Sequence, residues 1–142
     1  MSKQWLTKLM IFPPVLALLF FLYMSFVNSS YEHPGRVIYY SKCASCHGDH
    51  GEGTQNLVPP LYNTVFLKNN FETLPSLILN GMKDSVLVEG KWYNQPMYPI
   101  QLSSVEMANL LNFMNDSFLV EKKVDFIINS AWVETQISKM SK

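Results

Sequence analysis

The sequence predicts a mostly α-helical protein with one small β-hairpin and a transmembrane helix at its N-terminus. Three observations lead to this fold class. Residues 9–27 are apolar and carry no charge. Residues 103–115 combine a helix-capping pattern with apolar residues at helical spacing. Between these segments, both cysteines of the 142-residue chain lie in the stretch SKCASCHGDHGEG at residues 41–53.

The uncharged segment, LMIFPPVLALLFFLYMSFV, is expected to cross a membrane once. At about 1.5 Å per residue it spans about 28 Å, close to the hydrocarbon thickness of a bilayer. Lys3 and Lys8 precede it and the first acidic residue is Glu32. This charge distribution favours a cytoplasmic N-terminus, with the rest of the chain on the other side of the membrane.

The alternative for the same segment is a signal peptide that is removed after export. Its apolar run is longer than is usual for a signal peptide, and residues 27–29 do not match a small-x-small cleavage site. Both interpretations place residues after about 30 outside the cytoplasm. We therefore expect an anchor or signal at residues 1–30, a folded domain at 31–118 and a C-terminal extension at 119–142.

The exported part is nearly neutral and modest in size. Only Lys3 and Lys8 of the 11 basic residues fall in the first thirty, so nine basic and 11 acidic residues give it a net charge of about −2. It has no basic run of the kind that binds nucleic acid. About 112 residues suffice for one modest core, which gains from a covalent or metal cross-link.

Several short elements are predicted from local signals. Pro34 suits the first position of a helix that continues to about residue 42. Residues 48–60 are rich in glycine, proline and asparagine and predict a loop. Residues 74–79 predict a short helix that stops at Asn80-Gly81. Residues 86–93, with Gly90 between Val86-Leu87-Val88 and Trp92-Tyr93, predict a hairpin.

The clearest helix begins after Ser103. Ser103 and Glu106 have the spacing of a capping box. An apolar face is expected through about Asn115, made by residues at helical spacing: Val105, Ala108, Leu111, Phe113 and Met114. Residues 116–142 show weaker helical patterning, and the sequence QPMYPIQ at 95–101 must be extended or turn.

The sequence Cys43-Ala44-Ser45-Cys46-His47 fits the attachment site of a c-type haem. Each thiol adds to one vinyl group of the porphyrin. Two intervening residues allow one short helical stretch to reach both vinyl groups. The next residue then lies beneath the ring, where the imidazole of His47 can bind the iron. We therefore expect one haem c, bound covalently through Cys43 and Cys46.

Three other functions are conceivable for these residues: a redox dithiol, a zinc site and a disulfide. A thioredoxin-like dithiol would require a βαβ setting, which the pattern does not show. A structural zinc site needs four suitably spaced ligands, whereas Cys43, Cys46, His47 and His50 are crowded into eight residues. A disulfide is chemically possible outside the cytoplasm but does not explain the adjacent histidine.

A haem iron needs a sixth ligand or keeps an open face. The chain has eight methionines. Six of them lie in the N-terminal segment, in the tail or on the capped helix, where packing explains them: Met1, Met10, Met24, Met107, Met114 and Met140. Met97 lies in a proline-containing loop that can bring a thioether onto a flat cofactor, so it is the expected ligand. The alternatives are Met82, His33, His50 and an open face.

With these residues in place, residues 32–118 resemble a class I cytochrome c. Gly35 and Tyr39 precede the first cysteine by eight and four residues, as the glycine and aromatic of the family's first helix do. In the family these residues meet the last helix, and Phe113 stands at the matching aromatic position. The resemblance implies the cytochrome c fold.

The stretch GDHGEGTQNLVPPL at 48–61 resembles the family's glycine loop followed by Pro-x-Leu. The resemblance implies that the Pro59 carbonyl accepts a hydrogen bond from the His47 ring, which orients the ring and raises its basicity. It also implies that Leu61 packs on the haem.

The block from Ile78 to Asn115 resembles a subset of the family with a hairpin before the ligand. This register favours Met97 over Met82 and also occurs in cytochrome domains attached to quinoprotein dehydrogenases and oxidases. The chain departs from the pattern at Tyr98, which separates Met97 from Pro99 where the family often has proline directly.

The expected function is that of a membrane-tethered carrier that passes one electron between redox proteins, with no small-molecule substrate. A second interpretation makes the chain a dedicated subunit of one oxidase, reductase or dehydrogenase. A third is a haem peroxidase or gas sensor with an open iron face. A fourth is a thiol oxidoreductase without haem. Trp92, Tyr93 and Tyr98 flank the expected ligand loop, either as core and shield or as part of a partner-binding patch.

Overall fold

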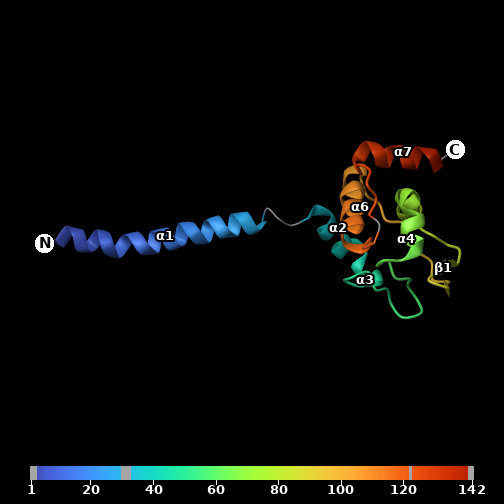
Figure 1. Ribbon diagram of the computed structural model, residues 1–142, viewed down its shortest axis with the longest axis horizontal. Coiled ribbons are helices and arrows are strands. Elements are labelled where there is room, and N and C mark those ends of the chain that lie inside the picture. The colour runs from blue at the N-terminus through green and yellow to red at the C-terminus, as the bar shows by residue number, and fades with distance from the viewer. Residues whose placement is uncertain (1–2, 30–32, 122, 141–142) are drawn as a thin grey trace. The chain divides into compact units, whose positions relative to one another are not determined.

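The computed structural model describes residues 3–29, 33–121 and 123–140. The chain divides into two compact units, Met1–Glu32 and His33–Lys142. The first contains α1 (Lys3–Ser29). The second contains, in order, α2 (Pro34–Lys42), α3 (Ala44–His47), α4 (Val65–Asn69), the 3-10 helix η1 (Phe71–Thr73), α5 (Leu74–Asn80), β1 (Val86–Val88), β2 (Lys91–Tyr93), α6 (Ser104–Phe118) and α7 (Ser130–Met140) (Figure 1). The mostly α-helical fold class with one hairpin is confirmed.

α1 is a single helix of 27 residues that continues through Pro13 and Pro14. All of its side chains from residue 13 to residue 26 are exposed within the chain. A search of the described residues finds no helix with the length and hydropathy needed to cross a membrane. Residues 1–2 and 30 of the expected anchor lie outside the described residues. The transmembrane helix expected at 9–27 therefore stays a prediction.

α2 and α6 pack against each other and form the framework of the second unit (Figure 1). Pro34 occupies the first turn of α2, and the ring of His33 accepts a hydrogen bond from the Gly35 N–H at 3.2 Å. The capping box between Ser103 and Glu106 is present at the start of α6. Both helix starts are therefore where local chemistry predicts them.

The buried face of α6 differs in part from the expected one. Ala108, Leu111 and Met114 are buried, but Val105 is 60% exposed, so its assignment to the apolar face was wrong. α2 crosses α6 at Asn109 and Phe113, about one turn further along, which leaves the first turn of α6 uncovered. The helix also continues to Phe118, beyond the expected end near Asn115.

α4 and η1 were not predicted. The side-chain oxygen of Thr64 caps α4 by accepting a hydrogen bond from the Leu67 N–H at 3.2 Å. Leu67 and Phe71 are almost fully buried, so the two short helices contribute directly to the core. α5 follows at once and ends at Asn80, as expected.

The hairpin has the expected position. Its register pairs Val86 with Tyr93, Leu87 with Trp92 and Val88 with Lys91. The turn residues Glu89 and Gly90 both have positive φ, which suits a two-residue hairpin turn. Because side chains alternate along a strand, Val88 and Tyr93 are buried while Leu87 and Trp92 form an exposed cross-strand pair.

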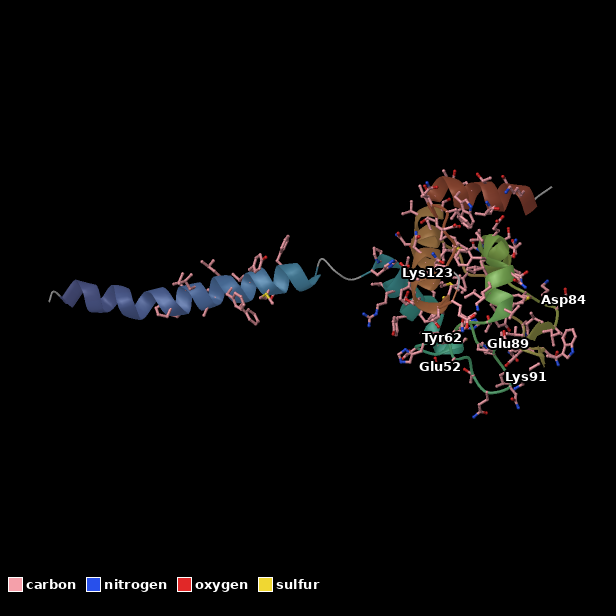
Figure 2. The ribbon with its side chains drawn as sticks, in the orientation of Figure 1. Glu52, Tyr62, Asp84, Glu89, Lys91 and Lys123 are labelled. Atoms are coloured by element: carbon pink, nitrogen blue, oxygen red, sulfur yellow. The ribbon has the colours of Figure 1, made fainter. Side chains whose placement is uncertain are left out.

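Charged side chains of the hairpin tie it to two other segments. The Glu89 carboxylate accepts a hydrogen bond from the Val65 N–H at 2.6 Å, at the start of α4. The Lys91 ammonium donates to the Gln55 carbonyl and to the Asn56 side chain. Glu89 and Lys91 both lie at the lower right of the domain in Figure 2. The hairpin thus joins α4 to the loop that follows α3.

The C-terminal extension folds back onto the domain. The Asn115 side chain donates to the Val124 carbonyl at 3.2 Å and accepts from the Val124 N–H at 2.9 Å. The Asn112 side chain donates to the Ile128 carbonyl at 2.9 Å. α7 then packs against α5 and α6, and Val133 is fully buried. Residues beyond α6 therefore contribute to the same core as α2, α4 and α5.

Candidate functional site

The two cysteines and His47 lie on one helical turn. Cys43 ends α2 and begins α3. Its carbonyl accepts hydrogen bonds from the N–H groups of Cys46 at 3.1 Å and His47 at 2.9 Å. Residues three and four apart in a helix share a face. The turn therefore presents two thiols and one imidazole toward the same side.

Both thiols are free, so the disulfide alternative is not formed. Cys43 is half-buried and Cys46 is exposed. Burial, and then the nearby Cys46, raise the pKa of the Cys43 thiol from 9.0 to about 11. Within the described part of the chain, no group of three or more His, Cys, Asp or Glu side chains could hold a metal ion. The zinc alternative, which used His50 with these residues, is therefore not supported there.

The ring of His47 is held by the Pro59 carbonyl, with 3.0 Å between Nδ1 and the oxygen. A carbonyl only accepts hydrogen bonds, so Nδ1 carries the proton and Nε2 keeps its lone pair. Burial lowers the pKa of His47 below its ordinary value of 6.5, and the contact with Pro59 opposes this only in part. The side chain is therefore a neutral, oriented imidazole with one nitrogen available to a metal.

Hydrogen bonds to the attachment turn, to α2 and within the loop itself hold the loop after His47. The Thr54 hydroxyl donates to the Cys46 carbonyl at 2.7 Å. The Tyr39 hydroxyl donates to the Gly48 carbonyl at 2.6 Å, and the Leu61 N–H donates to a neighbouring loop carbonyl at 2.7 Å. These contacts position Pro59 under His47. The hydrogen bond from Thr54 to Cys46 was not predicted, because no local sequence motif marks Thr54.

Met97 lies in an extended segment that pairs with Met82. The Met82 N–H donates to the Met97 carbonyl at 2.9 Å, and the Met97 N–H donates to the Met82 carbonyl at 2.8 Å. Directly opposed residues in such a bridge carry their side chains on the same face. The structure therefore brings together the expected ligand and the first alternative to it.

The two histidine alternatives to Met97, His33 and His50, have different surroundings from Met82. His33 caps α2, and its Nε2 lies 4.0 Å from the Asp116 carboxylate at the far end of α6. His50 is exposed, and its N–H donates to the Glu52 carboxylate at 2.8 Å. Neither histidine pairs with the Met97 segment in the described structure.

The three aromatic residues around Met97 divide into two groups. Tyr93 is buried and belongs to the interior, as the core interpretation predicts. Trp92 is 62% exposed and Tyr98 is 76% exposed, so neither fills the core. The turn from Met97 to Pro99 thus accommodates the additional Tyr98 by directing it to solvent.

The residues at the site fit a haem. Half-buried apolar side chains from the attachment turn, the loop after it and the Met97 segment pack against one core: Cys43, Ala44, Leu61, Met97, Ile100 and Leu102. Such partly open apolar surface suits a flat apolar ring, while His47 and Met97 supply nitrogen and sulfur donors. A separate open cavity of about 370 Å³ beside Arg36 and Tyr62 is lined by none of these residues.

Comparison with known proteins agrees with this chemistry. The family model for cytochrome c matches residues 33–117. The cytochrome c subunit of the quinone alcohol dehydrogenase of Gluconacetobacter polyoxogenes is 32% identical over 90 residues, which cover 60% of this chain and 19% of that protein. The chain thus spans about a fifth of the length of these dehydrogenase subunits.

Cytochrome c-552 of Thermus thermophilus is 32% identical over 90 residues, which cover 60% of this chain and 69% of that protein. The family match includes more than half of the chain and contains both cysteines. The chain therefore belongs to the cytochrome c family, as a class I c-type cytochrome that carries haem c covalently on Cys43 and Cys46.

Proposed function

We propose that His47 and Met97 would bind the haem iron and that the protein is a one-electron carrier. The observation that carries this proposal is the single turn that presents Cys43, Cys46 and His47 together, with Pro59 holding His47 so that Nε2 is available. The paired backbone of Met97 supplies a fixed second donor on an apolar segment.

The bound haem supplies an iron that cycles between Fe(II) and Fe(III). Around it, the chain contributes orientation and shielding. Pro59 fixes the His47 ring and raises its basicity. Leu61 and the half-buried side chains after Met97 exclude water from the ring, and an apolar setting with a thioether ligand favours the reduced state. Two protein ligands leave no position for a substrate, which distinguishes a carrier from a peroxidase or gas sensor.

The proposed tether is α1, in the cytoplasmic membrane, with the haem domain on the periplasmic side. Its sequence from Leu9 to Val27 has no charge, and its helix of 27 residues exposes the apolar side chains described between residues 13 and 26. Lys3 and Lys8 at the start favour retention of the N-terminus in the cytoplasm. A retained helix would keep the carrier near membrane-bound redox enzymes.

A second candidate is a subunit dedicated to one oxidoreductase. The similarity to a cytochrome c subunit of a quinone alcohol dehydrogenase favours it. Purification after mild detergent extraction separates the two candidates. A carrier is extracted as a single polypeptide, whereas a dedicated subunit is extracted together with stoichiometric partners. Retention in membranes washed with carbonate tests the tether, and release into the periplasmic fraction would overturn it.

The ligand assignment is tested on protein produced in cells that mature c-type cytochromes. Ferric haem with a methionine ligand has a weak far-red charge-transfer band. We expect Met97→Leu to abolish this band and Met82→Leu to keep it, because only Met97 binds the iron. The pair is matched because the two residues lie opposite each other in the same bridge. Loss of the band in Met82→Leu alone would transfer the assignment to Met82.

A further inference from the structure

We propose that Gly81, the residue after α5, is a positioning residue that sets the place of the Met97 ligand. The inference rests on the proposed function, because it assumes that Met97 binds the haem iron. The atoms nearest to a Cβ built on Gly81 are the Met97 carbonyl oxygen and the nitrogen and Cδ of Pro99. Gly81 acts through the backbone of the segment from Met97 to Pro99.

That segment is joined to the end of α5 by backbone hydrogen bonds at both of its ends. The two hydrogen bonds between Met82 and Met97 hold its beginning. The Ile100 N–H donates to the Ile78 carbonyl, within α5, at 2.9 Å and holds its end. The C-terminal turn of α5 and the residues just after it therefore form the surface on which the ligand segment lies.

Gly81 lies at the closest approach of these two segments. A Cβ built on Gly81 would stand 2.4 Å from the Met97 carbonyl oxygen and 2.9 Å from the Pro99 nitrogen. Real Cβ atoms essentially never approach other atoms closer than 3.0 Å. Both contacts are to backbone, which cannot rotate away as the end of a side chain can. Any side chain at position 81 must therefore displace the residue that carries the ligand sulfur.

Pro99, which follows Tyr98, completes the contact with Gly81. Tyr98 is 76% exposed, so the turn directs it outward and brings Pro99 onto Gly81. The Pro99 Cδ would lie 3.0 Å from the same Cβ. Because the proline ring is rigid, its contact with Gly81 limits how far the Met97 segment can move. The contact thus restrains a ligand segment in which Tyr98 stands between Met97 and Pro99.

The test compares Gly81→Ala with Gly90→Ala in the holoprotein. Both glycines have positive φ, +70° at Gly81 and +76° at Gly90, and Gly81 also has ψ −174°, a combination essentially restricted to glycine. A Cβ at Gly90 meets nothing within 4 Å. Gly90→Ala is therefore the control for a methyl group at a positive φ that displaces no neighbouring backbone. Two readouts report the bond between the iron and the Met97 sulfur: the far-red band of the ferric protein, and the affinity of added imidazole, which competes with Met97.

We expect Gly90→Ala to match the wild type in both readouts. Gly81→Ala should lose most of the band and bind imidazole about tenfold more tightly, because Met97 is no longer held on the iron. Equal band intensity and equal imidazole affinity in Gly81→Ala and Gly90→Ala would overturn the inference. The Met97→Leu experiment is independent: persistence of the band there would refute the ligand assignment itself.

A second variant covers the case in which Gly81→Ala does not accumulate as holoprotein. Pro99→Ala adds no atoms at Gly81 and removes the rigid ring that rests on it. It should keep the band at neutral pH but raise imidazole affinity above that of the wild type, because the Met97 segment moves more freely. An unchanged imidazole affinity in Pro99→Ala would count against the proposed positioning.

Discussion

Gly35 lies directly against the backbone of Asn109: a Cβ on Gly35 would stand 1.8 Å from the Asn109 carbonyl oxygen. The crossing of α2 and α6 depends on this contact. Alanine in place of glycine usually stabilises a helix, but here Gly35→Ala should destabilise the holoprotein by about 1–3 kcal/mol, because the helices must separate. Urea unfolding measures the change. Val37→Ala, an exposed change on the same helix, is the control, and a Gly35→Ala protein as stable as wild type would contradict the close approach.

Tyr39 joins α2 to the loop that follows His47. Its side chain is fully buried, and its hydroxyl donates to the Gly48 carbonyl at 2.6 Å. Tyr39→Phe should lower the free energy of unfolding by about 1 kcal/mol, because the carbonyl loses its partner while the ring packing stays. Tyr40→Phe, at an exposed neighbour, should change little in the same denaturation experiment. Equal stability losses in the two variants would show that the hydrogen bond contributes nothing specific.

Stability should depend on pH through the capping box of α6. Hydrogen bonds from the Ser103 N–H and hydroxyl lower the pKa of the Glu106 carboxyl below its ordinary value of 4.5. A lowered folded-state pKa stabilises the fold above the unfolded value, and this contribution disappears as the pH falls through the folded value. Glu106→Gln should therefore be less stable than wild type at neutral pH.

The difference should shrink as the pH falls below 4.5, the ordinary value for Glu106. Thermal melts of wild type and Glu106→Gln across this range measure it. Glu134→Gln, on the exposed side of α7, serves as a charge-matched control. A gap between wild type and Glu106→Gln that is constant with pH would argue against an ionised cap.

Asn115 fastens the C-terminal extension to α6 through Val124. Asn115→Asp keeps an acceptor for the Val124 N–H but removes the donor to the Val124 carbonyl, and it places a charge there. We expect a loss of about 1–3 kcal/mol in stability and faster hydrogen exchange at the Val124 amide. Asn94→Asp, at an exposed position after β2, is the matched control. Unchanged exchange at Val124 would mean that other contacts suffice to hold the extension.

Elements with strong local signals could be predicted from the sequence. Pro34 begins α2, Gly90 lies in the hairpin turn, and Ser103 with Glu106 begins α6, because each of these features is determined by residues close together in the chain. α4 is only five residues long and shows no apolar period. The one local signal in the sequence for α4 is its capping residue, Thr64.

Features that depend on contacts between distant segments could not be predicted from patterns. Val105 has the spacing of a core residue, but its burial is decided by where α2 crosses α6. Cys43, Cys46 and His47 were identified because their chemistry is local, whereas the partner of His47, Pro59, came from a family resemblance. The contact between Gly81 and Pro99 is visible only once the chain is folded.

The burial of Val133 on α7 affects which segment of the chain can be transferred to another protein as a folded domain. The family match ends at residue 117, yet Leu119, Ile128 and Val133 are buried in the core of the domain. A graft that stopped at 117 would leave the apolar faces of α5 and α6 in water and make the transplanted domain prone to aggregate. The transferable unit extends to α7, so a fusion partner or label belongs after that helix and not at the edge of the family match.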